Sequence, residues 1–349
     1  MIMANEFLLQ GKTLHAGDNM TEIFGSNLRI TRQESAGSQN FQLKPQLKTV
    51  EEIVISGQTQ IIHANCFRDF PNLKKISFAD GLQVIEESAF ENCPKLESVS
   101  FPSTLTEIGN NAFADCTALS KIEFNDSLDK LGNYVFKNTA VKEVDMTNSF
   151  SKLSSYIGLG VFLKCQNLEK VTMPKIYNGV PCEMFRDCPK LTEITLPQPY
   201  TVNGRNVTIG TTSFSGCISM QTISIPEGYT AIGFSAFKNC KSLSRADLPD
   251  TIKSIGDSAF SGCEALTDIQ LPSELTDIGL CVFARCSSVT KLELPSRLLS
   301  IGSSAFSLCD NLTLISRHTA TLSDYLSKTK DKLDINYTDT KPKAEHGMG

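Results

Sequence analysis

The stretch that decides the fold is LTDIQLPSELTDIGLCVFARC, from Leu266 to Cys286. It is one copy of a unit that recurs along most of the chain, usually at intervals of 23 residues. The clearest marker of the unit is a phenylalanine three residues before a cysteine. These phenylalanines are Phe90, Phe113, Phe162, Phe185, Phe214, Phe237, Phe260, Phe283 and Phe306.

Two further units keep the same frame without the cysteine. Phe67 and Phe136 are followed by Phe70 and Thr139 in the cysteine position, so eleven units cover roughly residues 50–317. A single unit has too few large apolar side chains to bury them alone, and neighbouring units must therefore stack and share a core. This predicts a solenoid whose successive turns carry parallel strands about 4.8 Å apart.

The first half of each unit predicts a short strand. Alternation of apolar and polar residues places Ile269 and Leu271 inside and Asp268 and Gln270 outside. A proline follows this strand in most units, where its missing N–H ends the ladder. A glycine such as Gly279 follows the second apolar pair, and we expect the chain to bend sharply there.

In-phase leucine, isoleucine, glycine, Ala-Phe and cysteine cover about three quarters of the chain. This pattern resembles the BspA-type leucine-rich repeat family, which has a similar 23-residue unit. The resemblance implies an α/β repeat solenoid, a right-handed and gently curved superhelix that is mostly β. Parallel strands would line its concave face, and short helical or 3-10 turns around Ala-Phe-x-x-Cys would form its convex side. It also implies adhesion or protein–protein interaction.

The two ends of the chain do not fit the repeat. Residues 1–49 are expected to form an N-terminal cap, because a bare solenoid end would expose apolar side chains and strand edges. Thr321 and Asp324 resemble a capping box that starts a short helix, and the sequence LDINY follows as a last strand. We assign residues 318–340 to a C-terminal cap and residues 341–349 to a flexible tail.

Composition limits the partners. The net charge is −5 and Lys and Arg are not clustered, which argues against nucleic acid. No stretch approaches the roughly 20 apolar residues of a membrane helix, so membrane insertion is not expected. The N-terminus has no basic segment followed by an apolar run, which predicts a cytoplasmic chain as written, or a surface or secreted one if an export signal was removed. We expect a monomer.

Nine of the twelve cysteines occupy one position of the unit and should form a column. No Cys-x-x-Cys occurs and no histidine recurs in phase, so neither zinc nor another metal is expected. Cysteines in adjacent turns would be close enough for disulfides, which stay open as an alternative. Phe70 and Thr139 take the same position, which favours buried free thiols that act as small apolar fillers.

The residues that could support catalysis are few. His63 and Cys66 are the only base and thiol that lie close together in the sequence. A hydrolase that uses this pair is a remote alternative. No phosphate-binding loop occurs, and neither a catalytic residue nor a cofactor is expected. The carboxylates expected to lie near one another are Glu143 with Asp145, and Asp247 with Asp268.

The outward strand positions predict a small, polar concave face of mixed charge without an aromatic anchor. Protein interfaces draw much of their energy from Tyr, Trp and Arg, so this face is the weaker candidate for binding. Its charged members are Lys121, Glu123, Glu143, Asp145, Lys170, Glu193, Arg245, Asp247, Asp268 and Lys291.

Two connections between the strand and the Ala-Phe-x-x-Cys turn are longer than in the other units, and they are a stronger candidate for binding than the polar strand face. The connection from Val144 to Phe162 spans 18 residues instead of 14, and that from Ile194 to Phe214 spans 20. Both insertions lie at the same place in the unit, so they should emerge from one flank of the solenoid about 10 Å apart. We interpret them as a binding patch. The alternative is that they have no function, because insertions at a surface cost little stability. With the turn between them the two insertions supply Phe150, Tyr156, Tyr177, Tyr200, Asn203, Arg205 and Asn206.

These features predict a non-enzymatic, adhesin-like module whose ligand is a host or self protein. The alternative is an intracellular scaffold or sensor component, which the missing export signal and the many cysteines favour.

Overall fold

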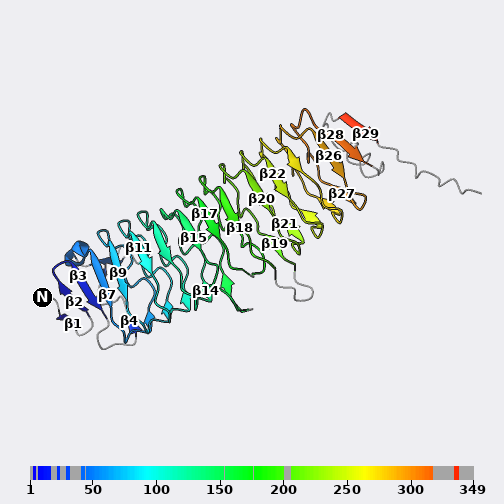
Figure 1. The fold of residues 1–349 in the computed structure, drawn as a ribbon. Helices are drawn as coiled ribbons and strands as arrows, with labels where there is room; N and C mark the ends of the chain where they lie inside the picture. The colour runs from blue at the N-terminus through cyan, green and yellow to red at the C-terminus, as the bar shows by residue number, and fades with distance from the viewer. Residues whose placement is uncertain are drawn as a thin grey trace, which may run out of the picture. The chain divides into compact units, whose positions relative to one another are not determined.

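The computed structural model describes residues 3–4, 7–16, 22–23, 29–31, 41–43, 45–152, 154–175, 177–199, 206–316 and 334–337. The chain divides into two compact units, Met1–Pro197 and Gln198–Gly349. Each unit is a parallel β-solenoid in which successive turns lie one on the next (Figure 1). The two units hold about eleven turns between them, as the repeat predicts.

The first strand of each turn forms what we call the long-strand face. These strands pair in parallel and in register, as Ser98 with Lys121, so equivalent residues of successive turns lie side by side. In the first unit they are β7 (Glu52–Ile55), β9 (Lys75–Phe78), β11 (Ser98–Ser100), β13 (Lys121–Glu123), β15 (Glu143–Asp145), β17 (Lys170–Thr172) and β18 (Glu193–Thr195). In the second they are β20 (Thr222–Ser224), β22 (Arg245–Asp247), β24 (Asp268–Ile269), β26 (Lys291–Leu294) and β28 (Thr313–Ser316).

A second strand of two residues follows in most turns and forms the short-strand face, which the sequence analysis did not anticipate. It contains the second apolar pair of the repeat and is too short to show alternation. In the first unit these strands are β8 (Ile61–Ile62), β10 (Val84–Ile85), β12 (Glu107–Ile108), β14 (Lys130–Leu131) and β16 (Tyr156–Ile157). In the second they are β19 (Thr208–Ile209), β21 (Ala231–Ile232), β23 (Ser254–Ile255), β25 (Asp277–Ile278) and β27 (Ser300–Ile301).

The segment around Ala-Phe-x-x-Cys is a run of turns, so the predicted helical or 3-10 turns and the α/β class are wrong. Ser88 and Asn92, two residues either side of Phe90, have φ angles of 55° and 58°, which interrupt any right-handed helix. The N–H groups of these three residues donate to carbonyls of the next turn at 2.8–2.9 Å. Bonds between turns thus replace bonds within a helix. The 3-10 helix among the described residues is η2 (Pro45–Thr49).

Stacked phenylalanines form the centre of each unit. The rings of Phe90 and Phe113 have centroids 5.2 Å apart, and those of Phe237 and Phe260 also lie 5.2 Å apart. All twelve cysteines are free thiols. In the core column at least eight of the nine thiols also donate a hydrogen bond to the phenylalanine carbonyl of the preceding turn, as Cys263 Sγ does to Phe237 O at 3.2 Å. The cysteine is therefore more than an apolar filler.

The glycines after the short strands allow close approach between turns. None of Gly109, Gly132 and Gly279 is among the residues with positive φ. A Cβ built on Gly132 would lie 2.5 Å from the backbone nitrogen of Asn110 in the preceding turn. Close approach between turns therefore explains this glycine column, and a left-handed backbone conformation does not.

At the N-terminal end, β1 (Met3–Ala4), β2 (Phe7–Gln10) and β3 (Thr13–Ala16) are antiparallel, and β3 pairs in parallel with β7. β4 (Glu22–Ile23) pairs with β8, and β5 (Arg29–Thr31) pairs with β6 (Phe41–Leu43). At the other end, β29 (Asp334–Tyr337) pairs in parallel with β28, which confirms the last strand. The predicted helix at Thr321 and the tail lie outside the described residues, and the cap boundaries stay predictions.

Candidate functional site

The long-strand face presents the predicted charged side chains to solvent. All ten of the charged positions named for it, from Lys121 to Lys291, are exposed. Several of them pair with one another: Lys121 Nζ lies 2.6 Å from Glu123, and Lys170 Nζ lies 3.3 Å from Glu193. Exposed pairs contribute only about 0–1 kcal/mol each, so they stabilise the coil little. They do neutralise much of the charge that a partner would meet.

The two predicted carboxylate pairs are occupied by local contacts. The Arg245 guanidinium lies 2.8 Å from Asp247 and 3.4 Å from Asp268, so one cation serves both carboxylates. Asp145 accepts hydrogen bonds from the hydroxyl and the backbone N–H of Thr147, which lower the pKa of its carboxyl below the usual value. A lowered pKa keeps this carboxyl ionised and unsuited to act as a general acid.

His63 and Cys66 lie in different surroundings. Cys66 is fully buried, while His63 Nδ1 lies 3.0 Å from the Glu86 carboxylate. Within the described ranges, no three His, Cys, Asp or Glu side chains are grouped as metal ligands would be. The same described residues contain no helix with the length and hydropathy needed to cross a membrane.

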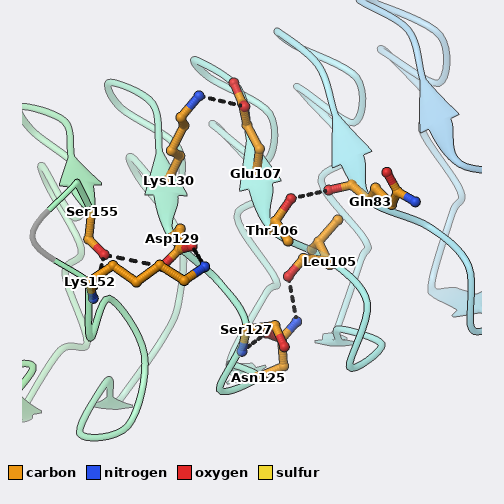
Figure 2. Close-up of polar contacts among 10 residues, drawn as sticks. All are labelled: Gln83, Leu105, Thr106, Glu107, Asn125, Ser127, Asp129, Lys130, Lys152 and Ser155. Carbon is orange, nitrogen blue, oxygen red and sulfur yellow. Dashed lines mark hydrogen bonds and ion pairs between the residues drawn. The ribbon is translucent and has the colours of Figure 1, made fainter.

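The first insertion folds back on the preceding turn. Phe150 is fully buried, and its N–H donates to Leu128 O at 2.9 Å, so its assignment to a surface patch is wrong. The reason is that the longer connection lets its ring turn into the core. Lys152 and Ser155 both contact the Asp129 carboxylate of the preceding turn, Ser155 at 3.1 Å (Figure 2). This loop is held by side-chain contacts along its length.

Two tyrosines of the predicted patch lie beside β16. The side chain of Tyr156 is exposed, at 51% of its full accessible surface. Tyr177 is half-buried, and its hydroxyl accepts a hydrogen bond from the N–H of Ile157 at 2.8 Å. In the preceding turns the equivalent position faces the next strand of the sheet. Asn206 is exposed and belongs to the second unit.

The remaining predicted patch residues, Tyr200, Asn203 and Arg205, lie outside the described residues. A patch that spans both insertions therefore stays a prediction.

Sequence reasoning missed a hollow on the short-strand face of the first unit, which we call the trough. Its volume is about 630 Å³, and Gly109 and Gly132 are among the residues that line it. The polar and aromatic residues that line it are Glu86, Glu87, Glu107, Asn110, Lys130 and Tyr156. The signal in the sequence was the glycine column with charged neighbours, which becomes a hollow only when the turns stack.

The register of the short strands orders the walls of the trough. Glu107 and Lys130 pair across β12 and β14, with their charged groups 3.1 Å apart (Figure 2). At one end the Tyr156 hydroxyl donates to Asn133 Oδ1 of the preceding turn at 3.4 Å. At the other end the Glu86 carboxylate contacts His63 and accepts the N–H of Ala64 at 3.0 Å.

Comparison with known proteins gives a family match. The family model described as BspA type leucine rich repeat region matches residues 37–157, 154–207 and 207–325. No curated protein matches the chain significantly.

Several solved structures are similar to this chain. A leucine-rich repeat protein from Bacteroides ovatus ATCC 8483 is 19% identical with a TM-score of 0.51, and the alignment covers 96% of this chain and 99% of that one. A leucine rich cell surface protein from Faecalibacterium prausnitzii A2-165 is 19% identical with a TM-score of 0.49, over 95% and 98%. The pneumococcal vaccine antigen PcpA is 17% identical with a TM-score of 0.43, over 96% and 98%. At this identity the Bacteroides ovatus match shows the fold alone.

Proposed function

Because the chain belongs to the BspA-type leucine-rich repeat family, we propose that it is a non-enzymatic module that binds another protein. The observation that carries the proposal is the in-register stacking of the turns, which repeats outward side chains in columns along each unit. Such columns offer an extended surface of the kind that repeat proteins use for partners. A host or self protein is the proposed ligand, in an adhesin-like role.

The contact surface that we propose centres on Tyr156, with Tyr177 beside it. An exposed tyrosine offers a large, rigid contact area and is typical of residues that dominate binding energy. The second insertion, with Tyr200, Asn203, Arg205 and Asn206, extends the proposed surface. The paired charges of the long-strand face would serve as a polar rim.

The experiment uses two aromatic residues that are matched in exposure. A partner is captured from source lysate, identified, purified and titrated against the full chain. Tyr156→Ala should weaken its binding about tenfold or more, as expected for a central aromatic. Phe234→Ala removes a ring of nearly equal exposure, 52%, from the other unit and should leave the affinity unchanged.

Equal affinities for the two variants and the parent chain would remove Tyr156 from the proposed surface. The double variant Tyr200→Ala with Arg205→Ala should weaken the same partner while the melting temperature stays the same. Turnover of a generic ester, peptide or glycoside substrate that His63→Ala abolishes would overturn the non-enzymatic assignment.

A second candidate function is an intracellular scaffold or sensor component. The observation that favours it is the set of twelve free cysteines, since unpaired thiols are typical of proteins from reducing compartments.

A further inference from the structure

We propose that the trough on the short-strand face of the first unit binds an extended, basic segment of the partner protein. The inference rests on the proposed function, because it names the chemistry of the partner segment. It requires that the trough fit an extended chain and that its walls favour positive charge.

The dimensions of the trough suit a short extended peptide. From the turn of Glu86 to the turn of Tyr156 there are three steps between neighbouring strands, or about 14 Å at about 4.8 Å each. An extended chain advances about 3.3 Å per residue, so about four residues fit between the ends. Gly109 and Gly132 line the trough between these ends and add no side chain that would fill it.

The hydrogen-bonding groups of the trough select for donors on the ligand. The N–H groups of Gly109 and Gly132 already donate to Ile85 O and Ile108 O, at 2.7 and 2.8 Å. The trough therefore offers neither of these N–H groups to an anion. The walls instead present carboxylate oxygens, which accept hydrogen bonds and favour ammonium or guanidinium groups.

The charge balance points the same way. Three carboxylates, of Glu86, Glu87 and Glu107, line the trough against the single ammonium of Lys130. Lys130 is paired with Glu107, and Oε2 of Glu86 already contacts His63 Nδ1. An added cation would therefore meet chiefly the Glu87 carboxylate and Oε1 of Glu86 on the adjacent turn. The exposed ring of Tyr156 adds a face on which a guanidinium or an aliphatic stem can stack.

The test measures fluorescence anisotropy of labelled hexapeptides with the full chain. The probe alternates arginine and glycine, and two matched probes replace arginine with glutamine or glutamate. At about 0.15 M salt the arginine probe should bind about tenfold more tightly than the glutamine probe, and the glutamate probe should not bind. Raising the salt to about 0.5 M should weaken the arginine probe several-fold.

Matched variants separate the trough from general attraction to an acidic chain. Glu87→Gln with Glu107→Gln should weaken the arginine probe about fivefold or more. Glu97→Gln with Glu169→Gln changes the net charge equally at exposed carboxylates elsewhere in the same unit, and should leave the affinity unchanged. Circular dichroism checks that both double variants fold.

The proposal is overturned if the glutamine probe binds as tightly as the arginine probe, or if the control double variant loses as much affinity as the trough variant. If the arginine probe does not bind while Tyr156→Ala still weakens a protein partner, the trough inference fails and the proposed function stands. If the probe binds as expected but no protein partner depends on Tyr156, only the proposed surface for whole proteins fails.

Discussion

At the scale of single residues, the cysteine position shows what the repeat requires. Cys188 Sγ donates to Phe162 O at 3.1 Å, and Thr139, in the same position of its own turn, donates to Phe136 O at 3.0 Å. Both side chains are small and carry one donor. The thiol bonds to the preceding turn and the threonine to its own turn, and Phe70 fills the same position without a donor, so the position favours a buried side chain and does not require a donor.

Glu51 provides a prediction about pH. Hydrogen bonds from Lys12 and Lys74 lower the pKa of its carboxyl from 4.5 to about 2. Because the folded-state pKa lies below the unfolded one, the charged form contributes stability that is present above about pH 4.5 and is lost as the pH falls towards about 2. The melting temperature of Glu51→Gln should therefore lie below that of the parent from pH 7 to 5.

The two melting curves should converge as the pH approaches 2. A deficit in Glu51→Gln that is as large at pH 2 as at pH 7 would show that the carboxylate charge contributes nothing.

At the scale of elements, the short-strand face depends on contacts between turns. β8 and β10 pair although His63 and Glu86 follow them, but from β12 onward the following residue is a glycine, where a Cβ would meet the backbone of the preceding turn. The glycine column removes that obstacle in successive turns. The sheet of the first unit ends at β16. There the Tyr177 hydroxyl accepts the N–H of Ile157, which would otherwise bond to a further strand.

Two glycines of the first unit test this interpretation. Alanine at Gly132 would place its Cβ 2.5 Å from backbone, which must shift, whereas the nearest atom to a Cβ at Gly57 is 3.5 Å away. Gly132→Ala should lower the free energy of unfolding by about 2 kcal/mol or more, and Gly57→Ala by less than about 1 kcal/mol.

Chemical denaturation of both variants gives the comparison. Equal losses of stability would mean that backbone flexibility, and not close approach between turns, explains the glycine column.

At the scale of the whole molecule, each turn contacts chiefly its neighbours, because the chain advances along one axis within each unit. The ring of Phe113 stacks on Phe90 and Phe136, with centroids 5.2 and 5.6 Å apart. Stability in such a protein is approximately a sum of the turns and of the interfaces between neighbouring turns. Damage to one turn should therefore stay local.

Phe113→Ala tests this locality. The loss of the ring should cost about 3–5 kcal/mol. Hydrogen exchange followed by mass spectrometry should show much faster exchange in the turns of Phe90 and Phe136 than in the turn of Phe185. Uniform acceleration throughout the first unit would instead indicate that the unit unfolds as one cooperative body.

The sequence by itself determined the repeat, the inward direction of residues such as Ile269 and Phe90, and the outward direction of Lys121 and Arg245. Periodicity is a local property, and it specifies which side of a strand faces the core. The tertiary structure alone decided that the turns around Phe90 are not helical, that Phe150 is buried and that two residues of the glycine column line a trough. Each of these depends on atoms in adjacent turns, about 23 residues apart along the chain, and the pattern within one turn does not specify how closely the next one packs against it.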